Sequence, residues 1–440
     1  MNSVSPITVI GGGLAGCEAA WQLAERGVPV VLVEMKPEHR SPAHTSDQLA
    51  ELVCSNSLRG AGLNAAVGLL KEELKKLGSL LIRAAEATAV PAGRALAVDR
   101  KRFSEAVASA IYSHPKIAVK AYKADQLPEG TVILATGPLT DGGLAEALSR
   151  FGALLNYHDA IAPLVTGESI DTAVVFAASR YEDPDDDGAY LNCPFTEQEY
   201  YRFVDALVLA EKTPLRSFES APFFEGCLPV EEIAVRGPLT LAHGPLKPVG
   251  LTDPRTGRRP FAVVQLRRED AAGTSFNLVG FQTRLTRPEQ RRVFRMIPGL
   301  ENVAFERYGQ VHRNSFVNAP EVLDGQLRLR GNTAVTIAGQ LSGVEGYVES
   351  IASGFAAGLY VAARHFGAEP PVFPTTTAIG GLMRYLTLKT ANFQPSNVVW
   401  MMIDTPPKKR GGKKARREAA AKKALTDLSM WKAAHLHLFP

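Results

Sequence analysis

The sequence lacks any uncharged apolar run of the roughly 18 residues that a membrane-spanning helix requires. Its apolar N-terminal stretch is interrupted by three consecutive glycines at 11–13 and has no secretory cleavage site. We therefore expect a soluble, cytoplasmic protein with no membrane partner. The 440 residues are 45% hydrophobic and 21% charged, which is typical of a globular chain of about two or three domains.

Cysteine is also scarce, with four residues and no Cys-x-x-Cys pair. This spacing argues against a zinc or thioredoxin-type site, and no metal ion is predicted. Disulfides are not expected in a cytosolic chain, so a functional cysteine would act as a thiolate. Cys54 and Cys227 lie in glycine-flanked loops and are the candidates, whereas small buried roles are expected for Cys17 and Cys193.

Positive charge is concentrated at the C-terminus. The chain has 49 Lys+Arg and 45 Asp+Glu, a formal net charge of +4. Residues 408–440 carry ten basic residues against Glu418 and Asp427, or +8, which leaves −4 for residues 1–407. Two interpretations stay open for this tail: contact with nucleic-acid phosphates, or a solvated helix or disordered terminus. Residues 415–425 favour a helix, and Trp431 offers it an anchor.

The N-terminal region has the pattern of a strand–helix–strand unit. Residues 7–10 and 30–33 are apolar runs typical of buried strands, and residues 14–26 have helical apolar spacing. The loop before the helix matches G-x-G-x-x-G, and an acid ends the second strand 18 residues later. Small residues let a pyrophosphate approach the helix N-terminus, and the acid can bind a ribose hydroxyl. The predicted dinucleotide-binding residues are Gly11, Gly12, Gly13, Leu14, Ala15, Gly16 and Glu34.

A second glycine loop precedes a helix near the other end of the chain. Residues 131–137 and 334–338 are predicted buried strands, and residues 347–366 form a predicted helix in which Gly354 and Gly358 permit close packing. An ordinary tight turn is the alternative interpretation of this loop. The two loops together resemble the FAD-binding fold of glutathione-reductase-like flavoproteins, which implies FAD. Further cofactor-binding residues are then Gly137, Gly339, Gln340, Gly343 and Gly346.

The fold class predicted from these patterns is α/β: a glutathione-reductase-like FAD-binding Rossmann domain with an inserted mixed α+β substrate domain. The FAD-binding domain is expected to be discontinuous, at 1–140 and 320–405. The substrate domain is expected at 141–319 and the basic tail at 406–440. No second G-x-G-x-x-G follows a strand, so a nicotinamide would dock transiently on the flavin face.

Longer segments spread over nearly the whole chain carry a second resemblance. They include Ala50-Glu-Leu-Val-Cys-Ser-Asn-Ser-Leu-Arg-Gly60, His44-Thr45, Gly68-Leu-Leu-Lys-Glu-Glu73, Phe224-Glu-Gly-Cys227, Val279-Gly-Phe-Gln-Thr283, His312-Arg-Asn314 and Gly343-Val-Glu-Gly-Tyr-Val-Glu349. Together they are similar to the tRNA (uracil-5-)-methyltransferases that use FAD and a folate, the TrmFO family. A related flavoprotein that modifies the tRNA wobble uridine shares the glycine loops, but it is longer and is not expected to carry both cysteine segments.

The resemblance implies methylation of C5 of the T-loop uridine of tRNA to 5-methyluridine. The carbon would come from 5,10-methylenetetrahydrofolate and the hydride from FADH2, which NAD(P)H regenerates. Uracil C5 is weakly nucleophilic, so such reactions begin with a thiolate adding to C6. By resemblance Cys227 is that nucleophile and Cys54 a second essential thiol, with the two roles open to exchange. Arg59 or Arg236, if folded against them, would favour the thiolates.

His312 and Gln282 are assigned by resemblance to binding of the folate or the uracil. The target uridine must leave its stack to reach the flavin. Because residues 1–407 are net acidic, binding of tRNA to this part of the chain requires a local basic patch. The candidate residues are Arg284, Arg287, Arg291 and Arg292.

Three alternative functions stay open. The first is a flavin oxidoreductase for a small molecule, which would not need Cys227. The second is the related wobble-uridine-modifying flavoprotein, and the third is a flavin-containing RNA-binding protein without carbon transfer. The partners predicted for the preferred function are tRNA and folate, with no obligate protein partner.

Overall fold

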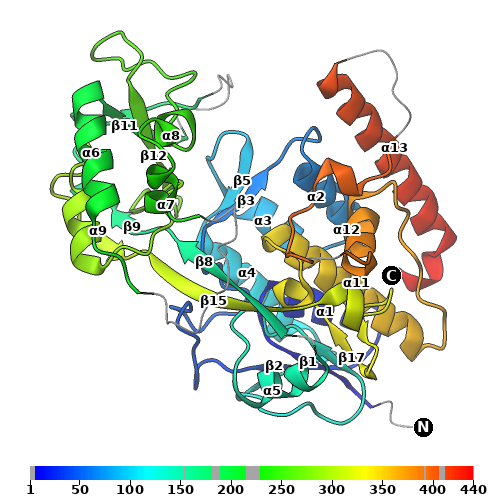
Figure 1. The fold of residues 1–440 in the computed structure, drawn as a ribbon. Helices are drawn as coiled ribbons and strands as arrows, with labels where there is room; N and C mark the ends of the chain where they lie inside the picture. The colour runs from blue at the N-terminus through cyan, green and yellow to red at the C-terminus, as the bar shows by residue number, and fades with distance from the viewer. Residues whose placement is uncertain are drawn as a thin grey trace.

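The computed structural model describes residues 5–152, 154–180, 189–214, 228–390, 393–405 and 412–439. They form two lobes, joined by a long ribbon of two strands (Figure 1). Among these residues, no helix combines the length and the apolar character that crossing a bilayer would need.

The first lobe contains a six-stranded sheet of order β16-β17-β7-β1-β2-β6. Five of its strands run parallel, and only β16 pairs antiparallel. The strands are β1 (Ile7–Ile10), β2 (Val30–Glu34), β6 (Ile117–Ala121), β7 (Val132–Leu134), β16 (Arg328–Leu329) and β17 (Asn332–Ile337). Since β16 and β17 come from the far end of the chain, the predicted two-part parallel sheet is present.

Two helices pack on this sheet with very close backbones. These are α1 (Leu14–Glu25) and α11 (Tyr347–His365). A Cβ on Gly354 would lie 2.2 Å from the Ala15 carbonyl oxygen, and one on Gly358 would lie 2.8 Å from the Ala19 oxygen. Close packing at these glycines is therefore confirmed.

The rest of this lobe consists of short elements around the same hydrophobic core. A three-stranded sheet has the order β3-β5-β4. These elements are β3 (Ser57–Gly60), α2 (Ala66–Leu77), α3 (Leu80–Ala87), β4 (Ala89–Val90), β5 (Ala95–Val98), α4 (Arg100–Ser113), α5 (Gly142–Arg150), α10 (Ala319–Val322) and α12 (Ala378–Thr387).

The second lobe has an antiparallel sheet of order β10-β11-β12-β13-β9-β14 and a hydrophobic core of its own. Its strands are β9 (Leu164–Thr166), β10 (Phe176–Ala177), β11 (Tyr190–Phe195), β12 (Ala262–Arg268), β13 (Ser275–Leu278) and β14 (Phe305–Arg307). Its helices are α6 (Glu197–Leu209), α7 (Val230–Val235), α8 (Thr240–His243) and α9 (Arg287–Phe294).

The ribbon between the lobes pairs β8 (Leu154–Ile161) with β15 (Gln310–Val317) over their full length. This register places Asp159 opposite His312. Tyr157 and Phe316 on these strands belong to the core of the first lobe. Both strands that connect the lobes, β8 and β15, therefore contribute side chains near the junction of the lobes.

The C-terminal residues form α13 (Lys413–Ala434), which lies against α2. Trp431 stacks on Phe373 with ring centroids 4.5 Å apart, and its indole N–H donates to the Val372 carbonyl. The anchoring role expected for Trp431 is confirmed. Residues 412–439 are thus a packed helix and its end, with most lysines and arginines on the exposed face.

Candidate active site

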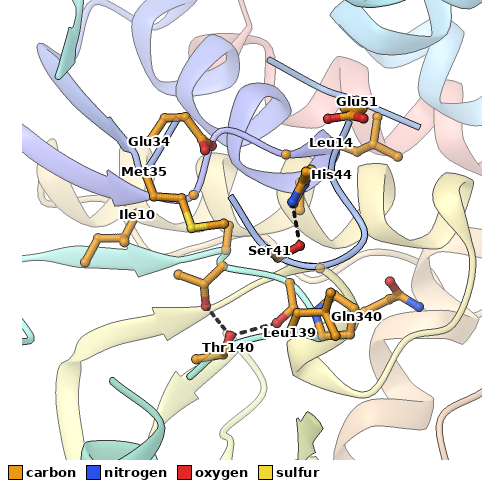
Figure 2. A pocket seen from close by; sticks show the side chains of 18 of the residues that line it. Ile10, Leu14, Glu34, Met35, Ser41, His44, Glu51, Leu139, Thr140 and Gln340 are labelled. Atoms are coloured by element: carbon orange, nitrogen blue, oxygen red, sulfur yellow. Dashed lines mark hydrogen bonds between the residues drawn. The ribbon is translucent and has the colours of Figure 1, made fainter. Parts of the chain in front are cut away.

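A deep cleft lies at the carboxyl ends of the parallel strands in the first lobe, where ligands bind in open α/β sheets. It has about 1140 Å³ of empty space including its open mouth. Figure 2 shows side chains from both glycine loops and from the segment after β2 around this space. The predicted residues that line it are Gly11, Gly13, Leu14, Ala15, Glu34, Gly137, Gly339 and Gln340.

The glycines of the first loop are needed for different reasons. Gly11 has φ +102, and a Cβ there would lie 2.4 Å from the Ala135 carbonyl oxygen. A Cβ on Gly16 would lie 1.8 Å from the Gly11 oxygen, so this glycine allows the helix to pack on the loop. Gly13 has φ −76 and no atom within 4 Å of its Cβ position. The fold itself does not require glycine at 13, and the open space there suits a phosphate at the start of α1.

Glu34 ends β2 at the edge of the cleft. Its Oε2 accepts from the Gly12 amide at 2.7 Å and its Oε1 from the Lys36 amide at 3.1 Å. A carboxylate has about four acceptor sites, so these bonds fix the side chain and leave capacity for a ribose hydroxyl. Gly12 is not among the residues that line the cleft, and a Cβ there would clash with Leu49 and Glu34.

Only part of the second glycine loop lines the cleft, and the other part forms the turn into α11. Gly339 and Gln340 line the cleft at the start of η3 (Gly339–Ser342), opposite Gly137. Gly343 and Gly346 do not line it. A Cβ on Gly343 would lie 2.5 Å from the Phe393 ring, and Gly346 has φ +104 at the N-terminus of α11. These two glycines permit the turn into the helix.

A buried carboxyl group lies beside Gln340. The Gln340 amide donates to both oxygens of Glu345, at 3.0 and 2.9 Å, and the Tyr157 hydroxyl also donates to Glu345. Burial and the nearby Asp159 carboxylate raise the pKa of Glu345 to about 7. The Glu345 carboxyl group, next to the cleft residue Gln340, is therefore protonated more readily than an ordinary glutamate. Glu345 lies inside a segment matched to the family, yet no sequence pattern distinguished it from its neighbours.

The Cys54 loop, residues 52–56, joins the cleft to the second lobe. The Tyr347 hydroxyl accepts from the Cys54 amide at 2.7 Å and from the Ser55 amide at 3.1 Å, while Tyr347 also lines the cleft. Val53, next to the thiol, lines the cleft as well. The backbone of the Cys54 loop is therefore held by a residue that also lines the cleft.

Three arginines hold the same loop. Arg100 donates to the Leu52 carbonyl, and Arg307 donates to the Val53 carbonyl at 3.0 Å. Arg267 donates to Ser55 Oγ at 2.7 Å and to Asn56 Oδ1 at 2.8 Å. Because Arg267 and Arg307 come from the sheet of the second lobe, the position of the loop depends on how the two lobes meet.

The charges around Cys54 differ from those expected. Burial raises the pKa of the Cys54 thiol to about 12, and Asp159 adds to the increase, whereas Arg307 and Arg100 lower it. Arg59, the cation considered from the sequence, forms an ion pair with Glu349 instead. Arg307 lies far from Cys54 in the sequence, so no local sequence pattern could identify it as a neighbour of the thiol. Cys227 lies outside the described residues.

His312 and Gln282 lie in different parts of the structure, the ribbon and the second lobe. His312 is half-buried on β15, and burial together with the Arg307 charge lowers its pKa, which favours the neutral ring. Its Nε2 has no hydrogen-bond partner among the described residues. Gln282 lies in the second lobe, where its carbonyl accepts from the Val230 amide at 2.7 Å. It thus contacts the chain three residues after Cys227.

Cleft residues that the sequence did not single out include His44 and Thr140 (Figure 2). His44 Nδ1 is hydrogen-bonded to Ser41 Oγ at 2.7 Å, and burial and Lys36 lower its pKa. The lowered pKa favours the uncharged ring at this side of the cleft. Its spacing from the glycine loops in the sequence gave no signal of this contact.

We expect alkylation of Cys54 by iodoacetamide to rise about tenfold per pH unit from pH 7 to pH 10 without a plateau. Only the thiolate reacts, and a thiol whose pKa is raised to about 12 is still mostly protonated at pH 10. The rate is measured by mass spectrometry of the Cys54 peptide. Arg307→Gln should slow the reaction at every pH, and Arg307→Lys should restore it. A plateau below pH 9 would show that the pKa of Cys54 is lowered rather than raised.

Comparison with known proteins gives consistent matches. The family model described as Glucose inhibited division protein A matches residues 6–369. A Geobacter sulfurreducens protein named methylenetetrahydrofolate--tRNA-(uracil-5-)-methyltransferase TrmFO is 57% identical over 97% of this chain and 99% of its own. A Heliobacterium modesticaldum protein of the same name is 52% identical over 98% of each chain.

A solved structure, Aquifex aeolicus GidA in its form II crystal, has a TM-score of 0.70 at 18% identity. The match covers 99% of this chain and 74% of the Aquifex chain. At this identity the likeness concerns the fold. Together with the parallel sheet and its two glycine loops, it confirms the predicted FAD-binding Rossmann fold class.

Proposed function

Because the chain belongs to the TrmFO family of methylenetetrahydrofolate--tRNA-(uracil-5-)-methyltransferases, we propose that it methylates C5 of the T-loop uridine of tRNA in the cytoplasm. The carbon comes from 5,10-methylenetetrahydrofolate, and the hydride comes from FADH2, which NAD(P)H regenerates. The observation that carries the proposal is Tyr347, which lines the cleft and also holds the backbone of Cys54. A cysteine next to a dinucleotide-binding cleft is what this chemistry needs.

The described residues fit FAD. Gly13 leaves open space for the pyrophosphate at the N-terminus of α1, and Glu34 has acceptor capacity for the ribose. Bound FADH2 supplies the hydride that reduces a one-carbon unit to a methyl group, chemistry that no side chain provides. The residues proposed to hold it are the two glycine loops, Glu34 and Gln340.

One of the two thiols is proposed to act on the uracil ring. We assign to Cys227 the attack on C6, which makes C5 nucleophilic, and to Cys54 a second essential role close to the cleft. His312, with a neutral ring and an unpaired Nε2, is proposed to contact the folate or the uracil, and so is Gln282. The two-part FAD-binding domain and the inserted substrate domain of residues 141–319 are proposed as the frame of this site.

One incubation tests the function. Purified, flavin-loaded protein is mixed with NADPH, carbon-labelled methylenetetrahydrofolate and unmodified tRNA, and the digested RNA is searched for labelled 5-methyluridine. We expect label at the T-loop uridine, and none when folate or reductant is omitted. Flavin turnover without RNA and without label would instead support a small-molecule oxidoreductase, and tRNA binding without label would support a non-catalytic RNA-binding protein.

A further inference from the structure

A cluster of two exposed arginines and two half-buried aromatic rings lies on the second lobe. The guanidinium carbons of Arg287 and Arg291, both on α9, lie 5.7 and 6.0 Å from the ring centroid of Tyr308. Arg291 also donates to the Tyr308 hydroxyl at 2.9 Å. Tyr308 stacks on Phe305, with centroids 4.9 Å apart and an interplanar angle of 15°. We name Arg287, Arg291, Phe305 and Tyr308 the Tyr308 surface.

The charges of this surface are not neutralised within the part of the chain that is described. Arg287 and Arg291 are exposed, and no carboxylate there lies within ion-pair distance of either. Arg284 pairs with Glu232, and Arg292 pairs with Glu289. The four-arginine patch expected from the sequence is therefore reduced to two available cations, held against an aromatic ring.

The Tyr308 surface is fixed to the Cys54 loop. Its neighbour Arg307 donates to the Val53 carbonyl and, at 3.4 Å, to the Cys54 carbonyl. Gln290, buried on α9, donates to the Gly309 carbonyl at 2.9 Å and accepts from the Gly309 amide at 2.8 Å. Tyr308, which contacts both arginines, directly follows Arg307 in the chain, and Arg307 positions the Cys54 loop. A ligand bound to the two arginines would therefore lie close to the residue that positions this loop.

We propose that the Tyr308 surface binds backbone phosphates of the tRNA strand that carries the target uridine. Arginine is suited to phosphate because its planar donors bind two oxygens at once, and the Tyr308 ring restricts the guanidinium orientation in advance. An exposed, unpaired cation pair on an otherwise acidic chain body complements a polyanion. The inference rests on the proposed tRNA substrate and adds the surface that receives it.

The test compares the double variant Arg287→Gln/Arg291→Gln with the wild-type holoenzyme in a salt series. Each phosphate contact contributes roughly 0.9 to the slope of log K against log salt, so the slope should fall by about 2. We expect tRNA affinity to fall about tenfold near physiological salt. The KM for tRNA should rise by a similar factor, while kcat at saturating tRNA and the bound FAD stay within about twofold of wild type.

Three controls make the result specific. Lys116→Gln/Lys120→Gln removes the same charge at β6, the edge strand of the other lobe, from Lys120 within the strand and Lys116 directly before it, and should leave the slope unchanged. Glu289→Gln/Arg292→Gln removes an ion pair from α9 without changing its net charge and should do the same. Tyr308→Leu should weaken binding because the guanidinium groups lose their platform, whereas Tyr308→Phe keeps the ring and most of the affinity.

The outcomes separate this inference from the function. A wild-type protein that neither binds nor methylates tRNA contradicts both. A wild-type protein that methylates tRNA, with a double variant of equal affinity and salt slope, contradicts only the Tyr308 surface. An equal loss in the β6 control also overturns it, because the effect would then be one of net charge. If polyglutamate binds to the Tyr308 surface and tRNA does not, the partner of this surface is an acidic protein rather than tRNA.

Discussion

Replacing Gly13 with valine is expected to give a folded protein that no longer retains FAD. The backbone at Gly13 has an ordinary φ of −76, and no protein atom lies within 4 Å of the position of its Cβ. A larger side chain is therefore compatible with the fold but occupies the space proposed for the pyrophosphate. We expect affinity for FAD to fall by about 100-fold or more, as for a side chain forced into a close contact.

The measurement is the visible flavin absorbance of the purified protein, together with thermal unfolding of the apoprotein. Gly16→Ala is the contrasting variant: its Cβ would lie 1.8 Å from the Gly11 oxygen, so it should unfold the loop and lower stability. Gly325→Ala, in open space without positive φ, is the neutral control. A Gly13→Val protein that purifies with a full complement of FAD would remove the first loop from the cofactor site.

The features predicted from the sequence are those encoded by neighbours in the chain. A strand, a glycine loop and a helix follow one another within residues 7–25, so composition and periodicity suffice to recognise them. The same holds for the second loop and α11, where glycines four residues apart lie on one helix face. The helix that packs against these glycines was not predicted, and the structure shows that it is α1.

The surroundings of Cys54 were not predictable in this way. Its loop is held by Arg100, Arg267, Arg307 and Tyr347, which lie 46 to 293 positions away in the sequence and belong to both lobes. Periodicity reports only which face of an element is buried, so it cannot identify such partners. The nearby Arg59 was the local candidate, but Glu349 binds it.

Family segments also contain residues whose role is in the framework. Lys71 donates to the carbonyls of Leu58, Arg59 and Gly60, at 2.8 to 3.0 Å, and so fixes β3. Glu73 accepts from the amides of residues 378 and 379 and caps α12. A sequence match to a family motif does not distinguish such residues from those that contact a substrate. Their hydrogen bonds do, because these bonds are already satisfied within the protein.

Replacing either Cys54 or Cys227 with alanine is expected to lower 5-methyluridine formation by a factor on the order of 10⁴ while FAD stays bound. For Cys54 the structure supplies the reason that the loss is chemical. The loop is held through its backbone and through Ser55 and Asn56, so removal of the thiol leaves its frame intact. Cys193→Ala, at a fully buried position in the core of the second lobe, is the control and should keep near-normal activity.

The two thiols can be assigned by trapping. In tRNA with 5-fluorouridine at the target, carbon transfer leaves fluorine on C5 in place of the proton that must depart, so the bond between C6 and the nucleophile persists as a covalent protein–RNA complex. We expect Cys227→Ala to form no such complex on a denaturing gel, and Cys54→Ala to form it only at the reduced rate of its carbon transfer. The reverse pattern exchanges the roles of the two cysteines. A complex with both single variants would show that the nucleophile is another group. Near-normal methylation by either variant would show that the thiol it lacks is not needed.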